Sequence, residues 1–504
     1  MRLHSQLRAR IPGAGFLLAM VAITLLATLL RLLFLEQKSY WFDEIFTVRI
    51  CRLPLSAFWM SLWRFEANMV LYYAMLRPWI HFGQAESWVR LFSVLWGVAS
   101  IPIMYLVGAQ LYGKRRTGVI GALLLCVNTA HVAYSQEARS YSLLILLCLL
   151  SLFFLLRTEQ QGLTNTFAYS TVSALAVYTH FHAIFFLAAQ WISVTVVCYG
   201  HLATKKIIIM ISLTTFLISP ALYYMLFRRS GQLVGVPQVH SHDVVRLLYF
   251  LVADGGRFRK ALSFLYLFCS GLAVYHLLRR WRSSQLQPQD WGLVIIVGCL
   301  LLPPLVTFVI SFWLPLFFPR YLLICLAPFV LLASQGLTEF RKMRLRWGIL
   351  GLTFGLSLGS VAYYYSRPKD DWRALTTYLL SHFQRGDVIV GDPQGAEVPV
   401  QYYSQVVQAS NRTVLSYVSA ALISRDMPNN AALRNDVPCG RVWLVVWGDN
   451  SRIKNAFQTV VPQYQQIDGR EFPISLSVSL YSDSSLNSPF SAHLDARRCP
   501  SSVR

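Results

Sequence analysis

Long apolar blocks separated by polar connections recur along the first 366 residues. Blocks such as 15–30 and 291–312 approach or exceed the roughly 18 apolar residues that cross a bilayer as a helix. We therefore predict a polytopic α-helical membrane protein with about eleven transmembrane helices. The predicted helices lie near 15–35, 87–112, 117–134, 140–156, 166–179, 183–200, 207–227, 261–278, 291–312, 320–337 and 347–365.

Two apolar stretches do not fit a simple span. The stretch 166–200 is too long for one ordinary helix, so we divide it at the polar sequence THFH, residues 179–182. The short run 69–82 is interrupted by Arg and Pro, and it predicts an amphipathic helix at the membrane interface. The first block is longer than a signal peptide and lacks a small-residue cleavage pattern, so we predict that it is retained.

The hydrophobic pattern changes after residue 366. DWRALTTYLLSHF predicts a helix, and GDVIVGDP and RVWLVVWGDN predict strands that end in turn residues. We divide the chain into a transmembrane domain, 1–366, that includes the outer loop 36–86, and a soluble α/β domain, 367–504. Asp392 and Asp449, which follow the strands, are more typical of turn formers than of ligands.

Basic residues indicate how the helices cross the membrane. The clusters at 114–116, 277–282 and 341–346 fall on one side when eleven helices are counted. The positive-inside rule makes that side the cytoplasm. We predict a multi-pass protein of a bacterial plasma (inner) membrane, with a cytoplasmic N-terminus and an extracytoplasmic domain at 367–504.

The charge of the chain lies mainly in the membrane region. The formal net charge is +22, of which residues 1–366 carry +20, although only 13% of all residues are charged. Outer-side cations suit either headgroup anchoring or an anionic substrate, and nucleic acid is not an expected partner. No CxxC, HExxH or P-loop motif occurs, so the sequence requires no cofactor, although a divalent metal is compatible with it.

Nine cysteines add little to this interpretation. Six lie in apolar blocks, where a small buried hydrophobic side chain is the usual role. Cys439 and Cys499 would face an oxidising compartment, and whether they form a disulfide stays open.

The first candidate site is in the outer loop, which begins KSYWFDEIFTVRI. Asp43 and Glu44 suit the first turn of a helix, where the helix dipole favours acids. We favour a second interpretation, in which a carboxylate partly desolvated by Trp41 and Phe42 acts as a general base.

Further candidates lie on the same predicted side. Glu137, Arg139 and Tyr141 are crowded into the short turn AYSQEARSYS, and the guanidinium fork suits a phosphate. Arg320 and Tyr321 begin the span at 320–337, as interfacial anchors or as additional phosphate ligands.

Two histidines, His180 and His182, lie at the outer end of the span at 166–179. Their spacing permits metal binding, but interfacial polar residues are the favoured interpretation.

Carboxylates, arginines and tyrosines on one side of a membrane suit sugar transfer from a polyprenyl phosphate. The acceptor hydroxyl needs a base, and the departing phosphate needs cations. A transporter or flippase for a lipid-linked or anionic solute is the alternative, but the spans carry few ionisable residues. A scaffolding protein would give no reason for acids and arginines to coincide.

The chain also resembles a known superfamily. WFDE, AESWVRLFSVLWG, HVAYSQEARSYSLL, YTHFHAIFFLAAQ, FPRYLLICLAPFVLLASQG and DDWRALTTYL occur in an order similar to that of the GT-C glycosyltransferases. Within them, the pattern is similar to the bacterial branch related to protein O-mannosyltransferases and lipid A aminoarabinose transferase.

The resemblance implies an inverting hexosyl- or pentosyltransferase that uses a polyprenyl or dolichyl phosphate sugar at the extracytoplasmic face. It implies catalytic roles for Asp43, Glu44 and Glu137, and donor-phosphate contacts for Arg139, Tyr141, Arg320 and Tyr321. The sugar stays open, as does the acceptor, which could be a glycan, a lipid or a protein.

Overall fold

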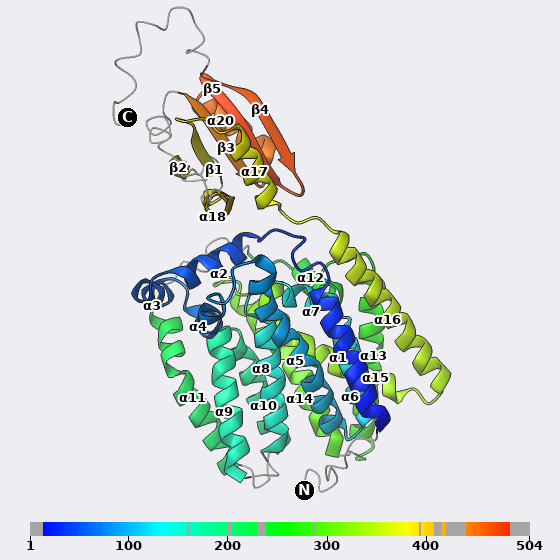
Figure 1. Cartoon of the computed structure of the whole chain (residues 1–504). Coiled ribbons are helices and arrows are strands. Elements are labelled where there is room, and N and C mark those ends of the chain that lie inside the picture. Colours follow the sequence, from blue (N-terminus) through cyan, green and yellow to red (C-terminus); the bar gives the residue numbers. More distant parts are fainter. Residues whose placement is uncertain are drawn as a thin grey trace, which may run out of the picture. The chain divides into compact units, whose positions relative to one another are not determined.

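The computed structural model describes residues 14–158, 162–198, 204–228, 238–285, 288–392, 395–407, 416–419 and 440–483. The chain divides into two compact units (Figure 1). The first comprises Met1–Leu35 and Thr47–Ser366, and the second comprises Glu36–Phe46 and Arg367–Arg504. The segment Glu36–Phe46, which the sequence analysis assigned to the membrane domain, therefore groups with the carboxyl-terminal unit. Cys439 and Cys499 lie outside the described residues.

Helices make up the first unit in the part of the chain that the structure describes. They are α1 (Ala14–Leu32), α2 (Phe42–Arg52, which begins in the second unit), α3 (Leu55–Arg64), η1 (Ala67–Met69), α4 (Val70–Trp79), α5 (Glu86–Tyr112), α6 (Arg115–Cys126), α7 (Thr129–Ser135), α8 (Tyr141–Arg157), α9 (Gly162–Thr179), α10 (Ala183–Cys198), α11 (Thr204–Phe227), α12 (His242–Ala253), α13 (Arg259–Arg282), α14 (Pro288–Ile310), η3 (Pro319–Cys325), α15 (Leu326–Glu339) and α16 (Met343–Ser366). Every predicted transmembrane range coincides with a helix or with two consecutive helices.

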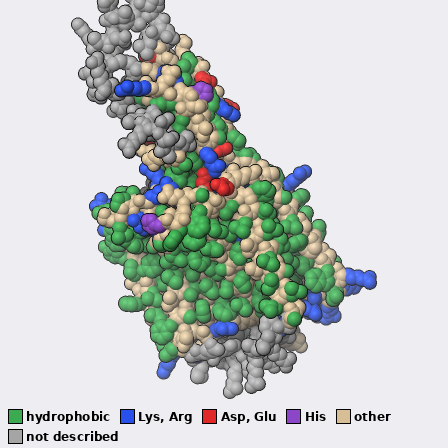
Figure 2. All heavy atoms as spheres, viewed as in Figure 1, with side chains coloured by type: hydrophobic (Ala, Val, Ile, Leu, Met, Phe, Trp, Pro, Cys, Tyr) green, Lys and Arg blue, Asp and Glu red, His purple; other side chains and the backbone are tan. Residues whose placement is uncertain are grey.

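The helices of the first unit make the chain a multi-pass membrane protein. Among the described residues, α1, α5, α11, α13, α14, α16 and the continuous pair η3–α15 are long and apolar enough to cross a bilayer. The pair α6 and α7, bent by 60°, makes an eighth candidate. Helices α8 and α10 are apolar but shorter, so length and composition support seven or eight spans where the sequence predicted about eleven. Figure 2 shows the broad hydrophobic surface that such a protein presents to lipid.

Small residues let the central helices approach closely. Helix α5 packs against α6 and α8. A Cβ added to Gly108 of α5 would lie 3.0 Å from the Cα of Gly118 of α6. Such contacts between small residues are typical of transmembrane helix packing.

A buried arginine donates hydrogen bonds to carbonyl groups at the C-terminus of α6 inside this helical unit. Arg31 of α1 is fully buried, and its Nη1 donates to the carbonyl oxygens of Ala27 (2.9 Å) and Cys126 (3.2 Å). Its Nη2 donates to the carbonyl oxygen of Leu125 (3.5 Å) and lies 2.5 Å from Nδ1 of His131. Carbonyl groups at a helix C-terminus have no intrahelical donor, and the membrane interior offers no water to replace one. Arg31 thereby stabilises the break between α6 and α7.

We expect Arg31→Leu to destabilise the protein by about 2–4 kcal/mol, because the Cys126 carbonyl loses the Arg31 donor and the Leu125 carbonyl keeps only the Asn128 N–H. The measurement is the thermal unfolding midpoint of the full chain in detergent, which should fall. Arg257→Leu, which replaces an exposed arginine of the same unit, is the matched control and should leave the midpoint unchanged. Equal midpoints for the wild type and Arg31→Leu would contradict the capping role.

The second unit contains a mixed five-stranded sheet of order β2-β1-β3-β5-β4. Its elements are α17 (Trp372–His382), β1 (Val388–Asp392), α18 (Glu397–Val407), β2 (Ser416–Ser419), β3 (Arg441–Trp447), α20 (Asn450–Val460), β4 (Tyr464–Phe472) and β5 (Leu476–Asp483). β1 pairs in parallel with β2 and β3, whereas β5 is antiparallel to β3 and β4. The helix and the two strands predicted from the sequence are present, and Asp449 caps α20 by accepting the Arg452 N–H (3.2 Å).

The segment Glu36–Phe46 is held within this second unit by contacts to residues far along the chain. The Ser39 hydroxyl donates to the carbonyl oxygen of Asp370 (2.9 Å), and the backbone N–H of Tyr40 donates to the Tyr403 hydroxyl (2.8 Å). Phe42 stacks on Trp447 with ring centroids 5.7 Å apart.

Asp370 makes the stability of the second unit depend on pH. Burial raises the pKa of Asp370 more than the hydrogen bond from Trp447 and the charge of Lys369 lower it. A raised folded-state pKa means that the neutral carboxyl stabilises the fold fully below its unfolded pKa, about 3.9. This contribution is lost as the pH rises through the folded-state value.

Asp370→Asn should therefore match the wild type near pH 3.5 and resist unfolding of the second unit better at pH 7. Limited proteolysis of the full chain in detergent, compared at the two pH values, measures this difference. Faster proteolysis of the variant at pH 7 would show that the ionised carboxylate stabilises the unit.

Candidate functional site

The adjacent acids Asp43 and Glu44 occupy the first turn of α2 and belong to the second unit. Glu44 is fully buried, and its Oε2 accepts the backbone N–H of Trp41 (3.3 Å) and lies 3.7 Å from Nζ of Lys369. Nζ of Lys369 also lies 5.2 Å from the centroid of the Trp41 ring. Asp43, by contrast, is partly exposed. Glu44 is therefore fixed by Trp41 and Lys369, and its neighbour Asp43 reaches solvent.

Within the first unit, Arg139 occupies the turn between α7 and α8. Only 8% of the residue is exposed. Its Nη1 donates to Oγ1 of Thr47 (3.2 Å) and to the Tyr73 hydroxyl (3.5 Å). Thr47 and Tyr73 thus help to hold the guanidinium in a buried position, where a cation interacts strongly with an anion.

A carboxylate that the sequence analysis did not single out joins this cluster. The Tyr73 hydroxyl donates to Oε2 of Glu66 (3.5 Å). Burial raises the pKa of Tyr73, with Glu66 acting in the same direction, so the phenol stays protonated as a donor. The sequence could have indicated Glu66 as a candidate, because it lies in the outer loop 36–86 beside aromatic residues, as Asp43 does.

Neighbouring helices fix the turn that carries Arg139. The Ser93 hydroxyl of α5 donates to the carbonyl oxygen of Arg139 (3.2 Å) and also lies 2.8 Å from the Tyr72 hydroxyl of α4. The Ser142 hydroxyl of α8 donates to the carbonyl oxygen of Ser93 (2.9 Å). Because three helices hold the turn, the guanidinium is positioned before any ligand arrives.

An aromatic and imidazole cluster lies close to this turn. The ring of His180 is 5.8 Å from that of Tyr141 and 5.2 Å from that of Tyr321. The ring of His182 lies 4.9 Å from that of Tyr321. The structure therefore brings together four of the residues singled out in the sequence, from three separate segments.

Charged residues surround the same cluster. His180 lies within electrostatic range of both Arg139 and Arg320. Tyr134 lies within electrostatic range of Glu137 and Arg320. The first unit thus gathers two arginines, tyrosines and a carboxylate at one place, a set that can bind a phosphate by charge-assisted hydrogen bonds.

The two histidines are engaged in contacts of their own. Nε2 of His182 donates to the carbonyl oxygen of Leu316 (3.0 Å), and Nδ1 of His180 accepts the backbone N–H of His182 (3.2 Å). Among the described residues, the group of three His, Cys, Asp or Glu side chains with ligand atoms within 4.8 Å of one another is His240, His242 and Asp243. The predicted weak metal ligands are not part of it.

Comparisons with known proteins identify the fold. No family model and no curated protein matches the sequence. ArnT from Cupriavidus metallidurans, solved with undecaprenyl phosphate, matches with a TM-score of 0.58 and 12% identity over 93% of this chain and 98% of that chain. The oligosaccharyltransferase AglB from Archaeoglobus fulgidus, solved with an inhibitory peptide and a dolichol-phosphate, matches with a TM-score of 0.56 and 11% identity over 95% of this chain and 75% of that chain. The chain therefore has the fold of the GT-C glycosyltransferases represented by ArnT and AglB.

Proposed function

We propose that this protein is an inverting membrane glycosyltransferase that moves a sugar from a polyprenyl or dolichyl phosphate to an acceptor hydroxyl. The observation that carries the proposal is the fold likeness, which spans more than nine tenths of the chain. The two similar proteins were solved with undecaprenyl phosphate and with a dolichol-phosphate, and both ligands are lipid-linked phosphates.

In the proposed reaction, the acceptor oxygen attacks the anomeric carbon while the bond from that carbon to the phosphate oxygen breaks. The carboxylate of Asp43 takes the hydroxyl proton as general base. Glu44, held by Lys369 and Trp41, positions the start of α2.

The lipid phosphate leaves with an additional negative charge. Arg139 and Arg320 stabilise this charge, and Tyr141 and Tyr321 donate hydrogen bonds to it. The buried position of Arg139 and its prearranged hydrogen bonds support this assignment. Glu137 and Glu66 are further members of the site, as polar neighbours of the phosphate ligands.

The proposed topology completes the assignment. Helices α8, α9 and α10 also cross the membrane in this proposal, which gives eleven spans and places the second unit outside the cytoplasm. The basic connections then face the cytoplasm of a bacterial plasma membrane, and transfer takes place at the extracytoplasmic face. The proposal requires no cofactor, and a divalent metal is compatible with it.

Comparative mass spectrometry of envelope lipids, polysaccharides and glycoproteins tests the function. A deletion strain should lack one sugar substituent, and complementation with the wild type should restore it. The missing substituent would name the sugar and the acceptor together. A deletion strain that keeps its complete glycan profile but accumulates or loses a lipid-linked precursor in one leaflet would favour the transporter or flippase.

A further inference from the structure

A groove lies on the surface of the first unit at the start of α16. It has a volume of about 730 Å³. Lys342 and Arg344 line its basic end, and Leu345, Gly348 and Leu352 are among its apolar lining. All of its lining residues belong to 342–352, so the groove is an open surface that joins two cations to an apolar face of one helix.

This groove lies at the depth of lipid headgroups. Helix α16 has 24 residues and is about 36 Å long, which exceeds the roughly 30 Å of a bilayer core. Its first turn therefore reaches the interface. Trp347, in the second turn, is 55% exposed, and exposed tryptophans are typical of the membrane interface.

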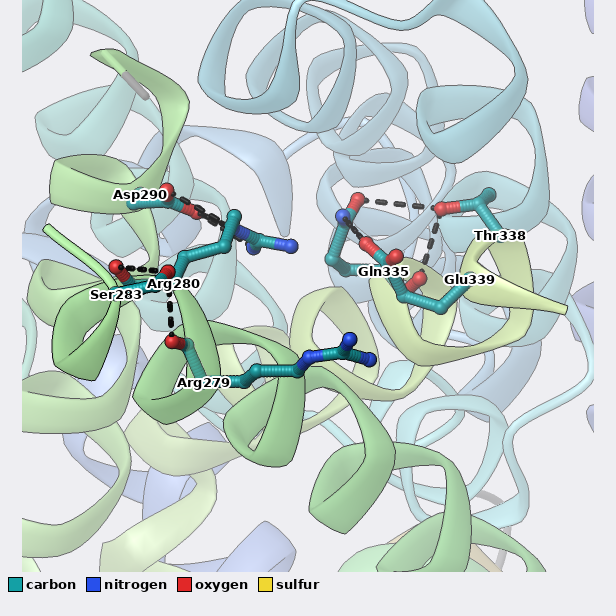
Figure 3. A network of polar contacts seen from close by, with 7 residues as sticks. All are labelled: Arg279, Arg280, Ser283, Asp290, Gln335, Thr338 and Glu339. Carbon is teal, nitrogen blue, oxygen red and sulfur yellow. Dashed lines mark hydrogen bonds and ion pairs between the residues drawn. The ribbon is translucent and has the colours of Figure 1, made fainter. Parts of the chain in front are cut away.

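Acidic side chains near this end of the helices are already engaged (Figure 3). Asp290 pairs with Arg280 (2.6 Å), and Oε1 of Glu339 accepts from Nε2 of Gln335 (2.6 Å). Among the residues that the structure describes, no acidic side chain pairs with Lys342 or Arg344.

Arg346, a further cation of the segment 341–346, donates hydrogen bonds within the protein. Nη2 of Arg346 donates to the carbonyl oxygens of Thr338 (3.0 Å) and Phe340 (2.6 Å). Lys342 and Arg344 are exposed. The cations that line the groove are therefore available to an anion from outside the chain.

The apolar part of the groove is open along the helix. A Cβ added to Gly348, Gly351 or Gly355 would meet no atom within 4 Å. Leu345 is 49% exposed and Leu352 is 54% exposed. An extended hydrocarbon chain fits such a surface, because it can follow the glycines without displacing a side chain.

We propose that this groove binds an anionic phospholipid, with its phosphate on Lys342 and Arg344 and an acyl chain along the glycine face of α16. A packed helix of a second copy is the other occupant that a glycine face permits. The α16 helix of a second copy contains no acidic residue and would not neutralise the two cations, whereas an anionic headgroup neutralises both. Charge complementarity therefore favours the lipid.

Native mass spectrometry of the purified full chain tests this proposal. The protein in detergent is titrated with dioleoylphosphatidylglycerol and, separately, with zwitterionic dioleoylphosphatidylcholine. We expect tighter binding of the anionic lipid. Lys342→Gln with Arg344→Gln should weaken that binding about 30-fold, because each removed cation interacts with an anionic headgroup.

A second variant tests the groove without changing its charge. Gly348→Leu places a side chain on the apolar part of the groove and keeps both cations, so the anionic lipid should bind at least about tenfold more weakly. Gly271→Leu adds the same side chain at an equally open glycine of α13, and should bind as the wild type does. Thermal midpoints of all variants should equal that of the wild type.

A charge control completes the design. Lys205→Gln with Lys206→Gln removes two exposed cations from the start of α11 and should preserve lipid binding. An equal loss of lipid binding in this control would show that any exposed cation attracts the anionic lipid, and it would overturn the proposal. Unchanged binding by the Gly348→Leu variant, or a wild-type dimer that the anionic lipid does not dissociate, would overturn it as well.

Discussion

An Asp43→Asn variant is expected to lose sugar transfer by about 10²–10⁴-fold while it keeps its fold and its donor affinity. The amide has the size of the carboxylate but cannot take the proton of the acceptor hydroxyl. The measurement is the initial rate of transfer by the purified full chain from a polyprenyl phosphate sugar, with kcat separated from the KM for the donor. A fall in kcat at constant donor KM is the expected result.

Two control variants separate this effect from a change in charge or in stability. Glu36→Gln removes an exposed carboxylate from the same segment and should leave transfer unchanged. Glu44→Gln removes the partner of Lys369, so we expect a lower thermal midpoint together with any loss of rate. Normal transfer by Asp43→Asn at equal protein level would reject Asp43 as the base, and Glu66 and Glu137 would be the next candidates.

The helices of the membrane region were predictable because apolar blocks long enough to cross a bilayer are easily identified in a sequence. The positions at which these helices bend or break were harder to predict. The sequence predicts one span over 117–134, yet α6 ends at Cys126 and α7 starts at Thr129. There the side chain of Asn128 accepts the His131 N–H (2.9 Å) and caps α7. A bend of this kind depends on side-chain capping and on Arg31, which comes from a distant helix.

The candidate site was partly predictable for a similar reason. Counting helices predicted that Arg139 and Arg320 lie on the same side of the membrane, and in the structure both lie within electrostatic range of His180. The count could not reveal that Thr47 and Tyr73 hold Arg139, because these hydrogen bonds join residues 92 and 66 positions apart.

The hydrophobic pattern also could not predict that Asp43 groups with the carboxyl-terminal unit. It depends on contacts such as that of Ser39 with Asp370, which are 331 positions apart. Hydropathy describes each segment by itself, and it carries no information about which distant segment a loop will contact.

Arg139→Ala is expected to weaken binding of the lipid phosphate about 10- to 150-fold, the range for losing a hydrogen bond to a charged group. Arg139→Lys should fall between this variant and the wild type, because it keeps the charge but loses the planar fork. Binding of the unsubstituted polyprenyl phosphate to the full chain, measured by titration, checks both values. Arg49→Ala, which removes an exposed cation of α2, should bind as the wild type does.

A purely structural role for Arg139 predicts a different pattern. Thr47 and Tyr73 would lose a shared donor, so the thermal midpoint would fall and affinities for donor and acceptor would decline together. A role in binding phosphate changes the donor affinity selectively, and Arg320→Ala should then act in the same direction. Tyr73→Phe distinguishes the structural role from the binding role. It removes the hydroxyl that links Arg139 to Glu66 and leaves the guanidinium in place. Donor binding by Tyr73→Phe close to that of the wild type, together with a large loss in Arg139→Ala, would assign the effect to the guanidinium. Unchanged donor affinity in both arginine variants would remove the arginines from the phosphate site.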